Sequence, residues 1–222
     1  MAEPPTSLDT VGISAAVVDI EGDVARLRTV GAGDLVHQEA LARLFSVYRE
    51  RLLRMVEFRL SPKVRARIDP WDVLQESFLD ASQRIESFQT FRGSFFKWIR
   101  LIVLQRIDWL HRHHLGTQKR DAYLDVSLER ALSPEDNNRL AEQLAASLTS
   151  PSQAVRRAEL IQVVNQILLG LKPIDREVLV LRHFEHLGNT EVAEVLEITP
   201  VAASVRYSRA LARLTSAMSP FV

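Results

Sequence analysis

The chain has 222 residues, a length that predicts one or two domains large enough to bury a hydrophobic core. Hydrophobic residues make up 46% of it and charged residues 25%, which is ordinary globular composition and excludes fibrous or Pro-rich architectures. Cysteine is absent, which excludes disulfides, thiolate metal sites and a cysteine nucleophile. The longest uncharged run has 13 residues, too few to span a bilayer, so we expect a cytoplasmic protein with no membrane insertion.

The formal net charge is zero, but the charges are segregated along the chain. Residues 1–40 hold seven acidic and two basic residues, whereas residues 97–120 hold six basic residues, three histidines and one aspartate. Residues 201–217 hold three arginines and no acid. Two separated basic surfaces indicate two contacts with anionic partners, and the acidic residues suit a different partner.

In the first half of the chain the pattern is helical after a weakly periodic stretch. We expect residues 1–24 to be a mobile N-terminal extension. Apolar residues recur at three- and four-residue steps over residues 38–60 and predict a helix there. Asp69 is the N-cap of a second predicted helix, and a loop over residues 87–94 separates this helix from a long one over residues 95–114.

In the second half, a polar stretch is followed by four predicted helices. Residues 117–149 are poorly periodic and have the composition of a linker, and Ser150 is the predicted N-cap of a helix that runs to Gly170. The other helices are predicted over residues 174–186, 190–197 and 200–217. No strand alternation is found, so the fold class is all-α, with two small helical domains joined by a flexible linker.

The last two predicted helices have the pattern of a helix-turn-helix motif. Ala202, Arg206, Arg209 and Arg213 share the outward face of the second helix, and the small Ala202 and Ser204 would allow its backbone to approach base edges in a major groove. The alternative is a three-helix bundle with a solvated arginine face. We favour DNA binding.

Aromatic and basic residues are interleaved at the start of the long helix. Lys97, Arg100 and His111 fall on one side of it, with Arg112 close by, and aromatic residues precede it in the segment 88–96. Aromatic faces that stack unpaired bases beside cations that bind phosphates are typical of single-strand recognition. The alternative is that these aromatic residues belong to the core.

An acidic stripe lies on the helix that begins at Asp69. It consists of Asp69, Asp72, Glu76 and Asp80, with Gln75 beside it. Such a stripe cannot face phosphate, so it faces either water or a basic partner protein.

Catalytic and metal-binding motifs are not found. The sequence has no Gly-rich phosphate loop, no nucleophile elbow and no zinc-protease motif. The pairs His111/His114 and His183/His186 have helical spacing but no evident third ligand. We therefore expect no enzyme activity, no catalytic residue, no metal and no cofactor.

Three segments, in this order, resemble the extracytoplasmic-function type of sigma factor in the sigma-70 family. They are Asp69 to Phe78, Phe95 to Ile99 with Asp108 and the basic tail His111 to Gly116, and Asp175 to Phe184 leading into residues 190–214. The resemblance spans about residues 25–217. The chain departs from many members at Gln105 and Ser204, where they carry Asn and Lys.

The resemblance implies a role for each segment in transcription initiation. It implies a sigma-2-like domain over residues 25–115, a linker over 116–155 and a sigma-4-like domain over 156–218. Asp72, Gln75 and Glu76 would bind the beta-prime clamp coiled coil of core RNA polymerase, and other partners would be the beta flap, promoter DNA and, where one exists, an anti-sigma factor. The implied minus-10 DNA residues are Phe88, Phe91, Arg92, Lys97, Arg100, His111 and Arg112. The implied minus-35 DNA residues are Thr199, Ala202, Ser204, Val205, Arg206, Arg209 and Arg213.

The alternative function is a stand-alone helix-turn-helix transcriptional regulator whose N-terminal domain senses a ligand or dimerises. Such a protein would bind duplex DNA without polymerase. It would need neither the face formed by Asp72, Gln75 and Glu76 nor the aromatic loop.

Overall fold

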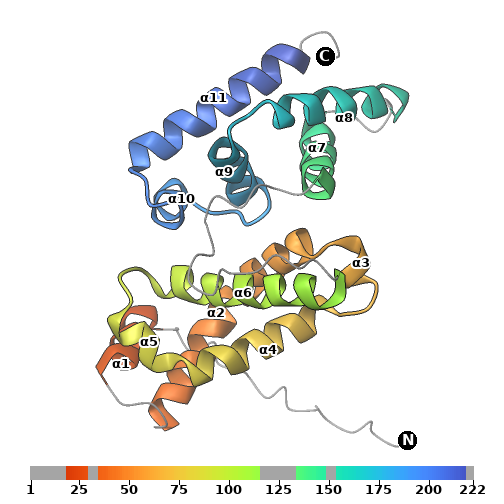
Figure 1. Ribbon diagram of the computed structural model, residues 1–222. Helices are drawn as coiled ribbons and strands as arrows, with labels where there is room; N and C mark the ends of the chain where they lie inside the picture. The colour runs from red at the N-terminus through yellow and green to blue at the C-terminus, as the bar shows by residue number, and fades with distance from the viewer. Residues whose placement is uncertain (1–18, 30–34, 116–133, 149–153, 219–222) are drawn as a thin grey trace, which may run out of the picture.

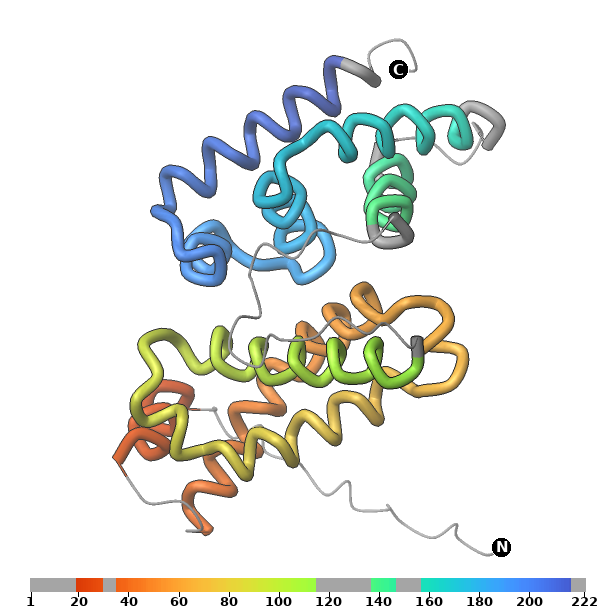
Figure 2. The backbone as a smooth tube through the Cα atoms, viewed as in Figure 1, coloured from red at the N-terminus to blue at the C-terminus, as the bar shows by residue number. Residues whose placement is uncertain are grey.

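The computed structural model describes residues 19–29, 35–115, 134–148 and 154–218, and these residues form eleven α-helices and no strand (Figure 1). The predicted all-α fold class is confirmed. The helices form two groups, α1–α6 and α7–α11, and Figure 2 shows α6 and the end of α2 facing the second group. The bounds are α1 Ile20–Thr29, α2 Leu35–Arg59, α3 Pro62–Arg65, α4 Pro70–Gln83, α5 Ile85–Thr90, α6 Phe95–Leu115, α7 Pro134–Leu148, α8 Ala154–Leu169, α9 Pro173–His183, α10 Asn189–Val195 and α11 Pro200–Met218.

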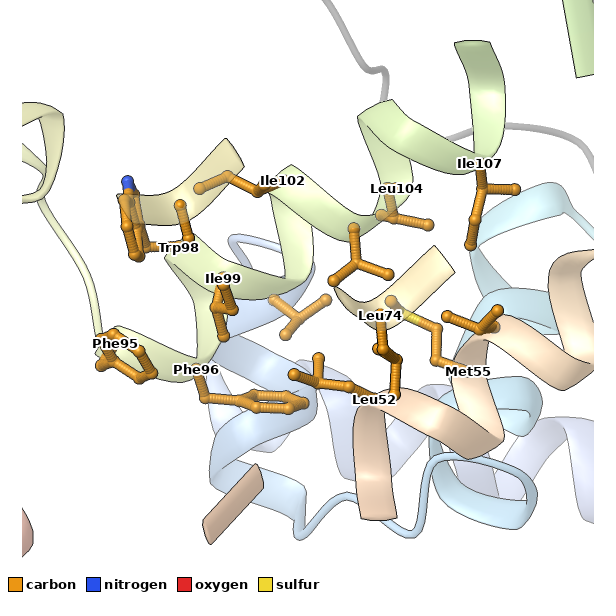
Figure 3. Packing of buried hydrophobic residues seen from close by; sticks show 14 of the residues in the cluster. Leu52, Met55, Leu74, Phe95, Phe96, Trp98, Ile99, Ile102, Leu104 and Ile107 are labelled. Carbon is orange, nitrogen blue, oxygen red and sulfur yellow. The ribbon is translucent and has the colours of Figure 1, made fainter. Parts of the chain in front are cut away.

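The first group is built on α2, α4 and α6, whose apolar faces meet in one core (Figure 3). Leu52 and Met55 of α2 lie against Leu74 of α4 and Ile99 of α6, and all four are at most 1% exposed. The start of α4 follows the sequence prediction, since the Asp69 carboxylate accepts a hydrogen bond of 2.8 Å from the Trp71 backbone N–H. This cap fixes where the acidic face of α4 begins.

Helix α1 lies partly in the segment that was expected to be mobile. Asp23 is 1% exposed and accepts hydrogen bonds from Arg26 and Arg43. The hydrogen bond from Arg43 is the largest of the effects that hold the pKa of Asp23 below its ordinary value of 3.8. Two arginines therefore stabilise a carboxylate that seals α1 onto α2, and residues 20–24 belong to the fold. Residues 1–18 lie outside the described chain.

The predicted loop before α6 is shorter than the sequence indicated. Helix α5 runs to Thr90, so only residues 91–94 connect it to α6. Phe88 is 0% exposed and packs in α5 against Phe95 and Trp98, with ring centroids 5.6 and 5.2 Å away. This aromatic packing stabilises a helix in a segment that is rich in small and aromatic residues and was predicted to be a loop.

Helix α7 lies inside the stretch that was interpreted as a polar linker. Leu140 and Leu144 are 0% and 2% exposed and share a core with Leu160 and Val164 of α8. The interpretation of residues 134–148 as poorly periodic was wrong, because its few apolar residues recur four apart and form one narrow stripe. The predicted N-cap Ser150 and the predicted helix stop Gly116 lie outside the described residues.

The burial of Leu140 predicts that α7 stabilises the second group. Leu140→Ala should lower the free energy of unfolding by about 2–5 kcal/mol, because it leaves a cavity in a packed core. Urea unfolding followed by circular dichroism measures this. Glu142→Ala, at an exposed position of the same helix, is the control and should change stability by less than about 0.5 kcal/mol. Equal stability of both variants would show that α7 is not part of the core.

Candidate nucleic-acid interface

The acidic stripe of α4 divides into structural and exposed members. Asp69 caps the helix, and Asp80 forms an ion pair of 2.6 Å with Arg106 of α6. Asp72, Gln75 and Glu76 are exposed on the same face, and Glu76 lies 3.7 Å from Arg106. These three residues therefore form an acidic and amide surface that a basic partner can reach.

Two large apolar side chains, which the sequence reasoning did not identify, lie at the ends of this surface. Trp71 is 41% exposed with the Arg49 guanidinium 5.4 Å from its ring centroid, and Leu79 is 53% exposed. Trp71 and Leu79 are spaced from Asp72 and Gln75 so that they lie on the same side of α4, and this spacing can be read from the sequence. A partner that docks here finds apolar contacts on both sides of the acidic residues.

Helix α1 supports the loop over residues 91–94. Arg28 donates hydrogen bonds to the carbonyl oxygens of Phe91 (3.3 Å) and Gly93 (2.9 Å), and its guanidinium lies 4.6 Å from the Phe88 ring centroid. Gly93 has φ +156°, and a Cβ there would meet the Phe91 ring at 2.9 Å, so the loop requires glycine. Arg92 is exposed and Phe91 half-buried. No sequence pattern pointed to Arg28.

The residues that were expected at minus-10 DNA fall in different environments. Phe88 is a core residue of its own domain, and we drop it from the candidate surface, because no rearrangement of the two groups would expose it. His111 accepts a hydrogen bond of 3.1 Å from the Ser61 backbone N–H, and Arg112 is exposed. Lys97 and Arg100, at 8% and 2% exposed, are buried against the second helical group.

The face of α11 that was expected to bind minus-35 DNA is largely open. Ser204, Val205, Arg209 and Arg213 are exposed. Together with Lys172, the arginines line a groove of about 590 Å³ between α9 and α11. The groove therefore presents several cations to solvent on one side of α11.

Three further residues of this face have partners or partial cover. Thr199 accepts a hydrogen bond of 3.1 Å from the Ala202 backbone N–H, as the predicted helix cap requires, and Ala202 is half-buried. Arg206 forms an ion pair of 2.7 Å with Asp175 of α9. Arg206 therefore has to leave Asp175 before it can contact a base.

The described residues contain no group of three or more His, Asp or Glu side chains placed to hold a metal ion. In the same part of the chain no helix is both long enough and apolar enough to cross a membrane.

Comparisons with known proteins show what the chain is similar to. Residues 161–214, which cover most of α8–α11, match the family model for region 4 of sigma-70. The chain is 27% identical over 185 residues to the ECF RNA polymerase sigma factor SigW of Bacillus subtilis, covering 83% of this chain and 90% of that protein. It is also 27% identical over 151 residues to the RNA polymerase sigma-H factor of Pseudomonas aeruginosa, covering 68% of this chain and 74% of that protein.

The chain is similar to sigma factors of the extracytoplasmic-function group, and its residues 161–214 match region 4 of the sigma-70 family. Its function is that of a sigma factor, which directs RNA polymerase to promoters and promotes transcription initiation. Among solved structures, a complex of CnrH with the cytosolic domain of CnrY aligns with 91% of this chain and 98% of that chain, at 23% identity and a TM-score of 0.48.

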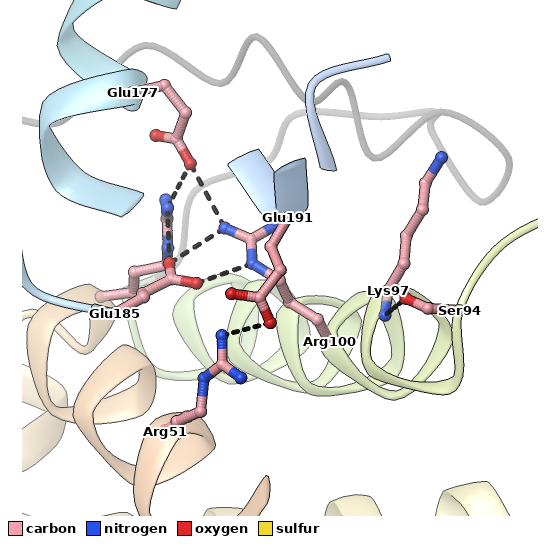
Figure 4. A network of polar contacts seen from close by, with 8 residues as sticks. Arg51, Ser94, Lys97, Arg100, Glu177, Glu185 and Glu191 are labelled. Carbon is pink, nitrogen blue, oxygen red and sulfur yellow. Dashed lines mark hydrogen bonds and ion pairs between the residues drawn. The ribbon is translucent and has the colours of Figure 1, made fainter. Parts of the chain in front are cut away.

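The two helical groups of this sigma factor meet through a buried ion network (Figure 4). Arg100 of α6 donates to Glu185 at 2.8 Å and to Glu177 at 3.3 Å, and Arg59 of α2 also donates to both carboxylates. All four side chains are at most 9% exposed. Arg100 was expected to contact DNA and no role was predicted for the two glutamates, because residues 77 and 85 positions away leave no local signal.

The charges in this network keep Glu185 ionised. Burial alone would raise the pKa of Glu185, but the charges and hydrogen bonds of Arg100 and then Arg59 outweigh it, so the pKa lies below the ordinary value of 4.5. Burial likewise acts to lower the pKa of Arg59, and Glu177 and Glu185 raise it instead. Glu185 and Arg59 are therefore both charged at neutral pH.

The lowered pKa of Glu185 predicts how stability depends on pH. A carboxyl group whose pKa is lower in the folded state stabilises that state above its unfolded pKa, and the contribution is lost as the pH falls through the folded value. At pH 7, Glu185→Gln should therefore be less stable than the parent by about 3–5 kcal/mol, because it leaves two buried arginines without full compensation. As the pH falls below 4.5 and through the lower pKa of the folded state, the difference between the two stabilities should shrink.

Urea unfolding of both proteins between pH 3 and pH 7, the range that brackets the ordinary carboxyl pKa of about 4, provides the measurement. The charged groups that face Glu185 are Arg59 and Arg100. Arginine side chains in general stay protonated throughout this range, so a change with pH in the difference between the two proteins follows the loss of the Glu185 charge. A stability difference between the parent and Glu185→Gln that does not change with pH would contradict a lowered pKa of Glu185.

Proposed function

We propose that this sigma factor binds core RNA polymerase through its first helical group and promoter DNA through both groups. The domains proposed from the sequence are 25–115 and 156–218, joined by residues 116–155, and the core around Leu140 supports extending the second domain to include α7. The observation that carries the proposal is the pairing of an exposed acidic and amide face on α4 with an exposed basic face on α11. A regulator that works without polymerase has no use for the first of these faces.

The face of α4 is the proposed contact with the beta-prime clamp coiled coil. Asp72, Gln75 and Glu76 offer carboxylate and amide oxygens to basic side chains, and Trp71 and Leu79 offer apolar area beside them. Apolar anchors next to charged groups are typical of protein interfaces, where the anchors supply affinity and the charges supply orientation. The beta flap is the proposed partner of the second domain.

The loop over residues 91–94 and helix α6 form the proposed surface for the minus-10 element of the promoter. Phe91 and Arg92 sit on a loop that Arg28 and Gly93 hold in a fixed shape, which suits the capture of an unstacked base. The same surface continues along α6 with Lys97, Arg100, His111 and Arg112. Lys97 and Arg100 can contribute only after the second helical group moves away from them.

Helix α11 carries the proposed surface for the minus-35 element of the promoter. Its first turns carry Ala202, Ser204, Val205 and Arg206, and small side chains at a helix start permit close approach to base edges. Arg209 and Arg213 lie farther along the helix, where phosphate contacts are expected. An anti-sigma factor, a cytoplasmic location and the absence of enzyme activity belong to the same proposal and rest on the family resemblance.

Co-purification with core RNA polymerase, followed by run-off transcription, tests the function. The reconstituted enzyme should initiate at a promoter selected from a random library, and core polymerase alone should not. Binding to duplex DNA without polymerase, together with no effect on initiation, would favour a stand-alone regulator instead.

The α4 face predicts a separation between docking and folding. Asp72→Ala and Gln75→Ala should each weaken binding to core polymerase about tenfold to a hundredfold, because a hydrogen bond to a charged group contributes about 1.5–3 kcal/mol. The thermal unfolding of both variants should match the parent, since both positions are exposed. Glu86→Ala, at an exposed position of α5, is the control for loss of surface charge. Unchanged affinity for polymerase in a pull-down would remove this docking assignment.

The α11 face predicts two classes of arginine. Arg206→Ala should change the preferred minus-35 sequence and cost about 1–3 kcal/mol on the best site, as expected for a lost base contact. Arg213→Ala should lower affinity evenly across sequences and reduce the salt slope by about 0.9, the value for one released phosphate contact.

A randomised minus-35 library transcribed by the reconstituted enzyme at two salt concentrations distinguishes these classes. Asp175→Asn is the matched control for Arg206, because it removes the ion-pair partner and leaves the arginine in place. If both arginine variants keep the parental preference and salt slope, the stripe is a solvated face.

A further inference from the structure

The outermost line of α11 carries no charge. Helix α11 runs along the side of the second group that faces away from α6 (Figure 1). Four exposed residues recur along it at steps of four, three and four and therefore share one line, here called the ridge: Val201, Val205, Ser208 and Ala212. The buried Ala210 and Leu214 lie on the opposite side of the helix. The ridge is therefore the part of α11 that points furthest from its own domain.

The cations of α11 lie beside the ridge rather than on it. Arg206 is turned toward α9, where it pairs with Asp175, and Arg209 and Arg213 line the groove between the two helices together with Lys172. Residues 200–218 contain no Asp or Glu. A polyanion that docks here therefore finds cations along one flank, where phosphates fit, and uncharged side chains at the centre, where base edges fit.

Two valines of the ridge have no structural reason to be apolar. Val201 is 73% exposed and Val205 39% exposed, so burial does not account for either. At an exposed helix position, valine is also a poorer helix former than alanine, lysine or glutamate. Single exposed apolar residues are common on protein surfaces, but these two lie one helical turn apart in the middle of a basic face. They therefore suit an apolar group carried by a polyanion.

We infer that Val201 and Val205 recognise thymine methyl groups in the major groove of the minus-35 element, so that its sequence contains A·T pairs at the positions they reach. The C5-methyl group of thymine is the apolar group that B-DNA presents in that groove. Residues four apart on a helix are separated by about 6 Å along its axis, and base pairs by about 3.4 Å, so the two valines reach thymines in adjacent or next-but-one pairs. The inference rests on the proposed assignment of α11 to minus-35 DNA.

The start of α11 holds these methyl groups in a fixed place. The Thr199 hydroxyl accepts a hydrogen bond of 3.1 Å from the Ala202 backbone N–H, and the Asn189 side chain of α10 donates one of 2.8 Å to the Pro200 carbonyl. Valine has one strongly preferred rotamer in a helix, so it loses little side-chain freedom on binding. A contact between methyl groups also involves no ion release. Its contribution should therefore be the same at low and high salt, unlike that of a phosphate contact.

Removal of single methyl groups from the DNA tests the inference. The full-length factor is assembled with core RNA polymerase, and the probe is the duplex promoter selected from the randomised minus-35 library. Each minus-35 thymine is replaced in turn by deoxyuridine, which lacks the methyl group and keeps the same hydrogen-bonding edge. At one or two positions this replacement should lower the affinity about fourfold, the value for one buried methyl group, at both salt concentrations.

Substitution of the valines shows which side chain contacts each methyl group. Val201→Ser and Val205→Ser should each abolish the uracil effect at one position and leave it at the other. Val201→Thr, which differs from Val201→Ser by one methyl group, should retain part of the effect. Val47→Ser on α2, the same change at a valine that is 36% exposed, is the matched control and should keep the whole effect. Circular dichroism and thermal unfolding should be unchanged in all four variants, since every position is exposed.

The position and the valine dependence of the uracil effect decide the inference. A fourfold effect that disappears in the matching serine variant supports it. A minus-35 element without thymines, thymines that uracil replaces at no cost, or a uracil effect that both serine variants retain overturns it. Weaker binding to core polymerase in the serine variants, with an unchanged uracil effect, also overturns it and assigns the ridge to a protein partner. Failure of the proposed function is a separate result, since the parent protein then neither binds core polymerase nor initiates transcription.

Discussion

The buried pairing of Arg59 and Arg100 with Glu177 and Glu185 determines which surfaces of this sigma factor are available. The two arginines come from α2 and α6 and the two glutamates from α9 and the turn that follows it, so one network fastens the two helical groups together. A lone ionised side chain in such a place is costly, and each charge is tolerated because the opposite charges are within hydrogen-bond distance. Neither group can present its network residues to DNA while the pairing persists.

The same chemistry allows these cations two exclusive partners. Arginine binds carboxylate and phosphate with the same planar fork of donors, and lysine attracts both as a point charge. Lys97 and Arg100 were assigned to DNA from their place on α6, and the structure shows them occupied by glutamates instead. The same side chains can therefore hold one anionic partner or another, but not both at once.

Local sequence signals predicted the elements well and their environments less well. The N-cap at Asp69 and the extent of α6 follow from capping chemistry and apolar spacing within a few residues, which is why they were predictable. Helix α7 was missed because its apolar stripe is narrow and its remaining residues are polar, and α5 because aromatic burial rather than propensity supports it. The burial of Arg100 depends on Glu185, 85 residues away, and a pattern among neighbouring residues cannot reveal a partner so far along the chain.

The neutral net charge, which is unfavourable for a protein that has to bind DNA, is consistent with this self-complementary contact. Acidic residues of the second group meet basic residues of the first, so much of the positive field that would attract phosphates is cancelled within the closed molecule. The arginines Arg209 and Arg213 on α11 stay exposed, yet a few phosphate contacts alone give only weak binding at physiological salt. Separation of the two groups would uncover the remaining cations. Charge cancellation in the free chain and DNA affinity in the assembled enzyme are therefore two consequences of the same set of residues.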